Sequence, residues 1–143
     1  MVNDFSRRDI KMAVLCKILH AKPDVVCLQE IGSISIAYLE VMRRLQYDIH
    51  VSRTDNNVAG VAFLVKRSFS KQYSLVVDEI CPGYLLALRS TAQKAFCIVN
   101  TYFSSLGFRF RSVQYTALNQ YSRNHPHHSF LLAGDQNRSD HSK

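Results

Sequence analysis

The sequence has no apolar run of the roughly 18 residues that a membrane-spanning helix needs, so no such helix and no membrane partner are expected. Its first eight residues contain no apolar segment, so we expect no secretory signal peptide. It also lacks internal repeats, low-complexity tracts and an interdomain linker. A chain of 143 residues with these features is expected to form one domain.

The four cysteines lack the Cys-x-x-Cys spacing that is typical of metal and redox motifs. We interpret Cys16, Cys27, Cys81 and Cys97 as reduced thiols of the protein core, because three of them lie in apolar segments. Reduced thiols predict an intracellular, reducing compartment. They do not distinguish the nucleus from the cytoplasm.

The chain is basic, with a formal net charge of +7 and an isoelectric point near 9.4. A basic surface favours polyanions, so nucleic acid is the expected partner, bound without sequence specificity. The alternative interpretation is that the charge serves solubility alone.

The periodicity of the apolar residues predicts helices near both ends of the chain and strands between them. The predicted helices cover residues 6–20, 34–45 and 109–122. The predicted strands cover residues 25–28, 47–51, 60–66, 73–77, 84–89, 95–102 and 129–133. This order predicts an α/β fold with a mixed β-sheet flanked by helices.

Two apolar segments end in acidic and amide residues. Residues 23–30 read Pro-Asp-Val-Val-Cys-Leu-Gln-Glu, and residues 130–137 read Phe-Leu-Leu-Ala-Gly-Asp-Gln-Asn. Each pattern predicts a buried strand that places a carboxylate at its C-terminal end, where open α/β sheets build their sites. Two carboxylates presented in this way suit a divalent metal ion and a phosphate ester.

The chain resembles the endonuclease/exonuclease/phosphatase superfamily, and within it the apurinic-type endonuclease domains of non-LTR retrotransposons. The resemblance depends on four motifs in order. They are residues 23–30, the Gly-Val-Ala strand at 60–65, the Asn-Thr-Tyr segment at 100–102 and Gly-Asp-Gln-Asn at 134–137. The Asn-x-Tyr form favours the nucleases, because relatives that act on lipids or protein–DNA adducts often have His-Leu there.

The resemblance implies a role for each matching residue. Glu30 and Asn3 would hold Mg²⁺ or Mn²⁺, and Asp135 would orient or deprotonate the attacking water. Asn137 would hold the phosphate, and the hydroxyl of Tyr102 would contact it. These residues would together catalyse phosphodiester hydrolysis, a reaction that needs positioned oxygens and neutralised charge.

Each of these residues also has a purely structural interpretation. Glu30 could be an exposed strand-end acid, residues 134–137 a plain turn, and Tyr102 an aromatic residue packed at a strand end. Arg109 and Arg111 could contact a DNA backbone, or they could be solvated charges at the start of a helix.

The family pattern extends well beyond this sequence, with a further Asp and a distant Ser-Asp-His element. The resemblance therefore implies a truncated domain over residues 1–137, about one half of the DNase I-like two-sheet α/β sandwich. Residues 138–143 are expected to form a polar disordered tail. The expected function is a metal-dependent phosphodiesterase domain that is poorly active or inactive alone. The alternatives are a non-catalytic DNA- or protein-binding module and a lipid or nucleotide phosphatase.

The half-domain interpretation predicts that one face of the sheet is uncovered. Strands 60–65 and 95–102 would present alternating apolar side chains to water, and exposed patches of that size usually seek a partner. We therefore expect self-association through this face, together with weak, non-specific binding of DNA.

Overall fold

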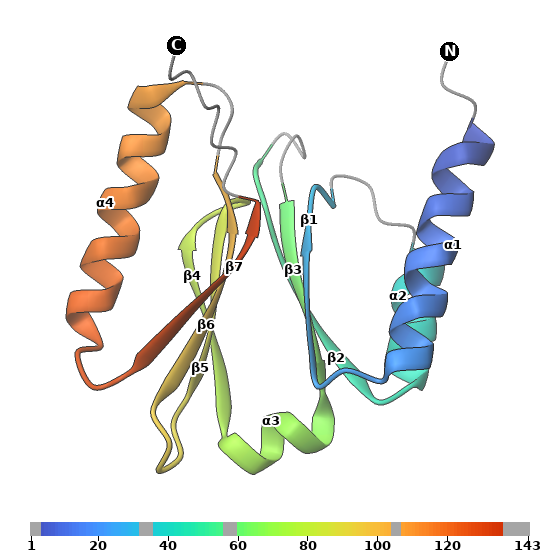
Figure 1. The fold of residues 1–143 in the computed structure, drawn as a ribbon, viewed down its shortest axis with the longest axis horizontal. Helices are drawn as coiled ribbons and strands as arrows, with labels where there is room; N and C mark the ends of the chain where they lie inside the picture. The colour runs from blue at the N-terminus through green and yellow to red at the C-terminus, as the bar shows by residue number, and fades with distance from the viewer. Residues whose placement is uncertain (1–3, 32–35, 56–59, 104–106, 136–143) are drawn as a thin grey trace.

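The computed structural model describes residues 4–31, 36–55, 60–103 and 107–135, shown as ribbon in Figure 1. Its helices are α1 (Asp4–Ala21), α2 (Ile36–Arg44), α3 (Arg67–Tyr73) and α4 (Phe108–Asn124). Its strands are β1 (Val25–Gln29), β2 (Tyr47–Arg53), β3 (Gly60–Lys66), β4 (Leu75–Cys81), β5 (Leu85–Ser90), β6 (Phe96–Tyr102) and β7 (Ser129–Asp135). The predicted mixture of helices and strands is therefore confirmed.

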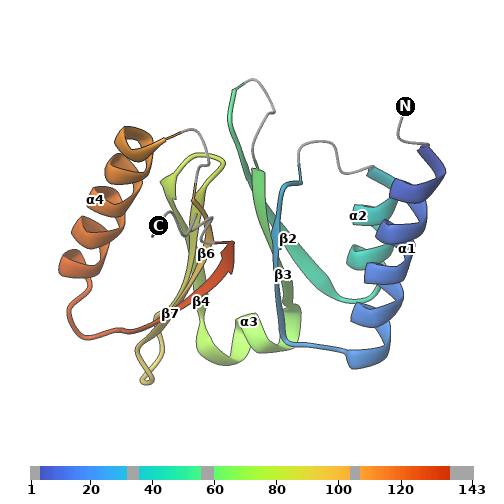
Figure 2. The ribbon, with the colours of Figure 1, turned by 45° about the horizontal axis from the view of Figure 1, so that its top comes forward.

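The strands form two sheets that face each other, with helices on the outside. The first sheet has the order β1-β3-β2 and the second has the order β4-β5-β6-β7. Helices α1 and α2 cover the outer face of the first sheet, and α4 covers the outer face of the second (Figures 1 and 2). Helix α3 joins the sheets at one end of the molecule. The result is a layered α/β sandwich.

Strand pairing is antiparallel except between β6 and β7. These two strands run parallel because α4 carries the chain back across the outer face between them, as a parallel pair requires. Both strands therefore end at the same edge of the sheet, with Tyr102 directly opposite Asp135. Strand β1 contacts both β6 and β7 across the sandwich.

Apolar side chains fill the three spaces between these layers. The central cluster, between the sheets, contains alternate residues of β3 and β5: Val61, Phe63, Val65, Leu86 and Leu88. The other face of β3 contributes Leu64 to a cluster with Ile18 of α1 and Met42 of α2. The other face of β5 contributes Leu85 and Ala87 to the cluster under α4. Since β3 and β5 are buried on both faces, they read as nearly continuous apolar runs.

The prediction that the inner sheet face is uncovered is wrong for the strands on which it was based. Val61 to Val65 are at most 1% exposed, and Val99 of β6 is fully buried. The physical reason is that this chain supplies strands to both sheets, so β3 and β5 cover each other. The exposed apolar residues of the sheets lie instead on strands such as β7, where Leu131 is 62% exposed. The expected self-association was based on an exposed face of these strands, and that face is buried within the chain.

Two smaller expectations also need correction. Cys16 is exposed on α1, so it is not a core thiol, whereas Cys97 is buried and all four cysteines are free. Helix α3 occupies residues that the periodicity left between two strands, and the strand expected to begin at Tyr73 begins at Leu75. The predicted tail, residues 138–143, lies outside the described residues. Over the described ranges, no helix is both long and apolar enough to cross a membrane.

Candidate active site

Glu30 lies at the end of β1 with an unusual backbone conformation. Its φ angle is +56°, in the left-handed region that residues with a side chain seldom adopt. The chain is held there on both sides, because β1 pairs with β3 up to Gln29 and the Ile31 amide donates to the Gly60 carbonyl at 3.3 Å. Such local strain costs about 1 kcal/mol or more and tends to occur at functional sites. It turns the chain out of the sheet at Glu30, whose side chain is exposed.

Asp135 is placed by the close approach of β7 to β6. Gly134 has a φ of +135°, and a Cβ atom there would lie 2.1 Å from the Thr101 carbonyl oxygen. Only glycine can fit at this point. The Asp135 carbonyl then accepts a hydrogen bond from the Phe103 amide at 3.0 Å, which fixes the end of β7 beside Tyr102.

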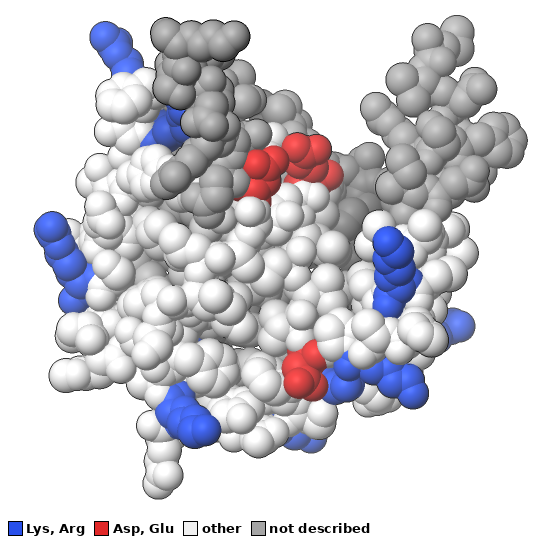
Figure 3. Space-filling view, in the orientation of Figure 1, with Lys and Arg blue, Asp and Glu red and all other residues white. Residues whose placement is uncertain are grey.

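Tyr102 lies within the electrostatic influence of both carboxylates, those of Glu30 and Asp135. Its pKa is raised by burial, by the negative charges of Glu30 and Asp135, by Tyr84 and by a hydrogen bond with Glu30. Two carboxylates from opposite ends of the chain therefore act on one phenol. Acidic side chains gather near the upper middle of the face shown in Figure 3, where β1 and β7 end in Figure 1. At neutral pH the hydroxyl keeps its proton, so it can donate a hydrogen bond.

A buried amide behind this edge ties the two sheets together. Asn100 is fully buried on β6, and its Nδ2 donates to the carbonyls of Leu28 at 3.1 Å and Ala62 at 2.8 Å. Its Oδ1 accepts from Nε2 of Gln29 at 2.8 Å. These bonds fix β1 against β6 one residue before Glu30 and two residues before Tyr102.

Asn100 belongs to the Asn-Thr-Tyr motif, but the sequence alone assigns it no role. The alternation of β6 contained a signal, because Asn100 falls on the same face as Phe96 and Ile98. A polar residue at an inward position of a buried strand must find hydrogen-bond partners.

The other predicted site residues do not join this cluster in the described structure. Asn3 and Asn137 lie outside the described residues. Arg109 and Arg111 lie in the first turn of α4, which starts six residues after the end of β6 and lies at the same end of the molecule (Figure 1). Arg109 is exposed and Arg111 is half-buried.

The chemistry of the cluster fits a hard divalent cation. Glu30 and Asp135 are both exposed, their negative charges meet at Tyr102, and carboxylate oxygens are the ligands that Mg²⁺ and Mn²⁺ prefer. Among the described residues, no group of three or more His, Cys, Asp or Glu side chains could hold a metal ion. The described part of the chain therefore offers such an ion two carboxylates, those of Glu30 and Asp135.

Solved structures share this fold. C. elegans TDP2 matches with a TM-score of 0.67 at 19% identity, over 97% of this chain and 45% of that one. The human Nocturnin catalytic domain, with bound sulfate, matches with a TM-score of 0.63 at 20% identity, over 94% of this chain and 58% of that one. D. rerio TDP2 in complex with single-strand DNA product matches with a TM-score of 0.56 at 16% identity, over 90% of this chain and 54% of that one. The chain thus spans about half the length of these proteins.

At the level of sequence, no curated protein matches the chain. The model of the Endonuclease/Exonuclease/phosphatase family matches residues 2–142, nearly the whole length. The match includes β1, β3, β6 and β7, whose ends or pairings build the cluster of Glu30, Tyr102 and Asp135. The chain therefore belongs to the Endonuclease/Exonuclease/phosphatase family.

Proposed function

We propose that this chain carries part of the active site of a divalent-metal phosphodiesterase that acts on DNA, and that it is poorly active alone. The observation that supports this proposal most directly is that Asp135 lies directly opposite Tyr102 in the strand register and that the charges of Glu30 and Asp135 both raise the Tyr102 pKa. The similarity to retrotransposon-type endonucleases is a finer proposal. It depends on the Asn-Thr-Tyr segment at residues 100–102.

Glu30, Asp135 and Tyr102 would each have a different role in hydrolysis. Glu30 would hold Mg²⁺ or Mn²⁺, which supplies positive charge that neutralises the phosphate oxygens. The Asp135 carboxylate would accept a hydrogen bond from the attacking water and orient it towards phosphorus. The Tyr102 hydroxyl, whose raised pKa keeps it protonated at neutral pH with a wide margin, would turn its proton from the Glu30 carboxylate to a phosphate oxygen. Asn3 and Asn137 remain the proposed further ligands of metal and phosphate.

DNA is the proposed substrate for two reasons. The chain has a net charge of +7, so a polyanion is attracted to it. One protein of the same fold, D. rerio TDP2, was solved in complex with single-strand DNA product. A non-catalytic DNA-binding module is the second candidate, favoured because the described residues offer a metal ion only two carboxylates, those of Glu30 and Asp135.

A plasmid-nicking assay tests the proposal. Supercoiled DNA is incubated with the chain and Mg²⁺, with Glu30→Ala and EDTA as controls. We expect slow nicking that both controls abolish, because groups that act as a unit lose most of their rate when some are missing.

The other outcomes separate the candidates. Nicking that persists in Glu30→Ala would contradict the site. Robust nicking by the unmodified chain would contradict the expected low activity. DNA binding without any nicking would favour the binding module and overturn the catalytic proposal.

A further inference from the structure

The first turn of α4 exposes an unusual amount of aromatic surface. Phe108 is 80% exposed, and Phe110 and Val113 are 40% and 64% exposed. Together with Gly107 and Arg109, these residues line an open hollow of about 650 Å³. A phenylalanine side chain left in water forgoes the favourable burial of a large apolar group, so an exposure of this size calls for an explanation.

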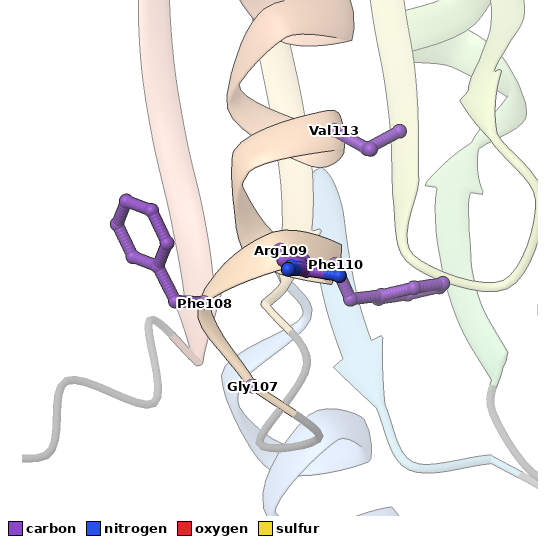
Figure 4. Close-up of a pocket in the computed structure, with 5 residues that line it drawn as sticks. All are labelled: Gly107, Phe108, Arg109, Phe110 and Val113. Atoms are coloured by element: carbon purple, nitrogen blue, oxygen red, sulfur yellow. The ribbon is translucent and has the colours of Figure 1, made fainter.

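A row of rings connects this surface to the candidate active site. The Phe110 ring lies 5.2 Å from that of Tyr84 at an angle of 67°. Tyr84 in turn stacks on Tyr102, with centroids 5.9 Å apart and planes 2° from parallel. Figure 4 shows Phe108 projecting from the helix on the side opposite Phe110. Phe110 is therefore engaged with the protein, whereas the Phe108 ring points outward.

The charge of this surface indicates which kind of ligand would bind to the exposed Phe108 ring. Arg109 is exposed between the two phenylalanines, and the first turn of α4 contains no acidic residue. A purely apolar partner would gain nothing from an arginine at this position. Nucleic acid has both of the required groups, since a base offers a flat face for stacking and its phosphate pairs with arginine.

We propose that Phe108, with Arg109 beside it, is a stacking site for an unpaired base of single-stranded nucleic acid. The inference rests on the proposed function, because the first turn of α4 lies at the same end of the molecule as the Tyr102 edge, so one strand would reach both. A continuous duplex keeps its base faces stacked inside the helix, so this site favours single strands. Phe108 acts as the stacking platform and Arg109 as the contact to the adjacent phosphate.

Fluorescence anisotropy in EDTA tests the site without any hydrolysis. Two labelled probes of equal length and charge are used, a thymidine oligonucleotide and the same backbone with abasic sites. We expect Phe108→Ala to weaken binding of the thymidine probe by about fivefold or more, with no change for the abasic probe. Phe108→Tyr should retain binding of both. Val41→Ala, an exposed apolar residue of α2 on the opposite side of the molecule, is the matched control and should bind both probes like the unmodified chain.

Several results would overturn the proposal. They are an unchanged affinity of Phe108→Ala for the thymidine probe, an equal loss for the abasic probe, or an equal loss in Val41→Ala. Sedimentation of the variants shows whether the ring instead holds two copies together, which would also overturn it. Nicking that continues without any dependence of binding on Phe108 would defeat only this site. Phe108-dependent binding without nicking would defeat only the catalytic proposal.

Discussion

At the scale of single residues, Gly134 positions the Asp135 carboxylate although it has no side chain. Its φ of +135° and its approach to the Thr101 carbonyl allow β7 to lie close against β6. Asp135 then falls opposite Tyr102 in the strand register. The glycine of the Gly-Asp-Gln-Asn motif is therefore explained by steric necessity.

We expect Gly134→Ala to destabilise the protein more than Gly107→Ala does. Both glycines have positive φ angles, +135° and +129°, so both substitutions introduce backbone strain. At Gly107 a Cβ atom would meet nothing within 4 Å, whereas at Gly134 it would lie 2.1 Å from Thr101 O. The difference in free energy of unfolding should be about 1–3 kcal/mol, the usual cost of overpacking. Urea denaturation of the two variants measures it, and equal losses would show that β7 moves freely away from β6.

The placement of Glu30 and Asp135 at strand ends could be predicted from the sequence, because each follows or ends an apolar strand, whereas Tyr102 is identified only through the family resemblance. The supporting role of Asn100 could not, since its partners at Leu28 and Ala62 lie 72 and 38 residues away. No local pattern shows which backbone carbonyls a buried amide will face.

At the scale of elements, α4 is joined to the second sheet by a polar cluster of three residues. Asp78 of β4 accepts hydrogen bonds from Arg89 Nε at 2.9 Å and from the Tyr121 hydroxyl at 2.6 Å. Burial favours a higher pKa for Asp78, but these bonds and the charge of Arg89 outweigh it, so the pKa lies below its ordinary value. The ionised carboxylate therefore stabilises the docking of α4.

We expect this cluster to lose its contribution to stability in acid. Because the pKa of Asp78 is lowered on folding, its contribution is complete above the ordinary value of 3.8 and disappears as the pH falls through the lower pKa of the folded state. Asp78→Asn should therefore destabilise the protein at pH 7 and make its stability less dependent on pH below about 4. Urea denaturation across this range measures both effects.

Asp48→Asn is the matched control for Asp78→Asn. Asp48 also pairs with an arginine, Arg67, at 3.0 Å, but both side chains are at least 40% exposed. Exposed pairs contribute about 0–1 kcal/mol, so the control should change little. If the two variants lose the same stability at pH 7, the Asp78 cluster does not dock α4.

Most elements could be predicted because their apolar residues follow a clear period. Helix α3 could not, because its seven residues contain no buried side chain and no side-chain cap. It begins with Arg67, whose side chain binds Asp48 and Gln46 of other segments, so tertiary contacts help to place it. The division of the strands into two sheets is likewise a tertiary property. Local alternation shows that β3 is buried on both faces but does not identify what covers it.

At the scale of the whole molecule, a net positive charge is combined with an acidic edge formed by Glu30 and Asp135. Figure 3 shows Lys and Arg side chains spread around the rim of one face, acidic side chains near its upper middle, and a second acidic group lower down beside basic side chains. A phosphate backbone would be attracted by the rim and repelled by the carboxylates unless a cation lies between them. This arrangement predicts weak binding that depends on counterion release.

We expect DNA affinity to fall steeply between low and moderate salt, without sequence preference. Each phosphate contact adds about 0.9 to the slope of log affinity against log salt, so Arg109→Gln should reduce that slope by about 1. Lys71→Gln on α3, which lies at the other end of the molecule in Figure 1, is the control and should leave the slope unchanged. Anisotropy titrations at several salt concentrations measure the slopes. An affinity that hardly changes with salt would show that phosphate contacts do not drive binding.

The hydrogen bonds of Asn100 can form only after β6 has been synthesised. A chain leaves the ribosome N-terminus first, so all of the first sheet emerges before β6 brings this amide to the carbonyls of Leu28 and Ala62. Asp135 ends β7 and is synthesised 105 residues after Glu30. A nascent chain halted before β7 would contain the Leu-Gln-Glu strand but would lack the carboxylate that faces it across Tyr102. The acidic edge therefore forms only after β7 has been synthesised, and a chain halted earlier has only one of its two carboxylates.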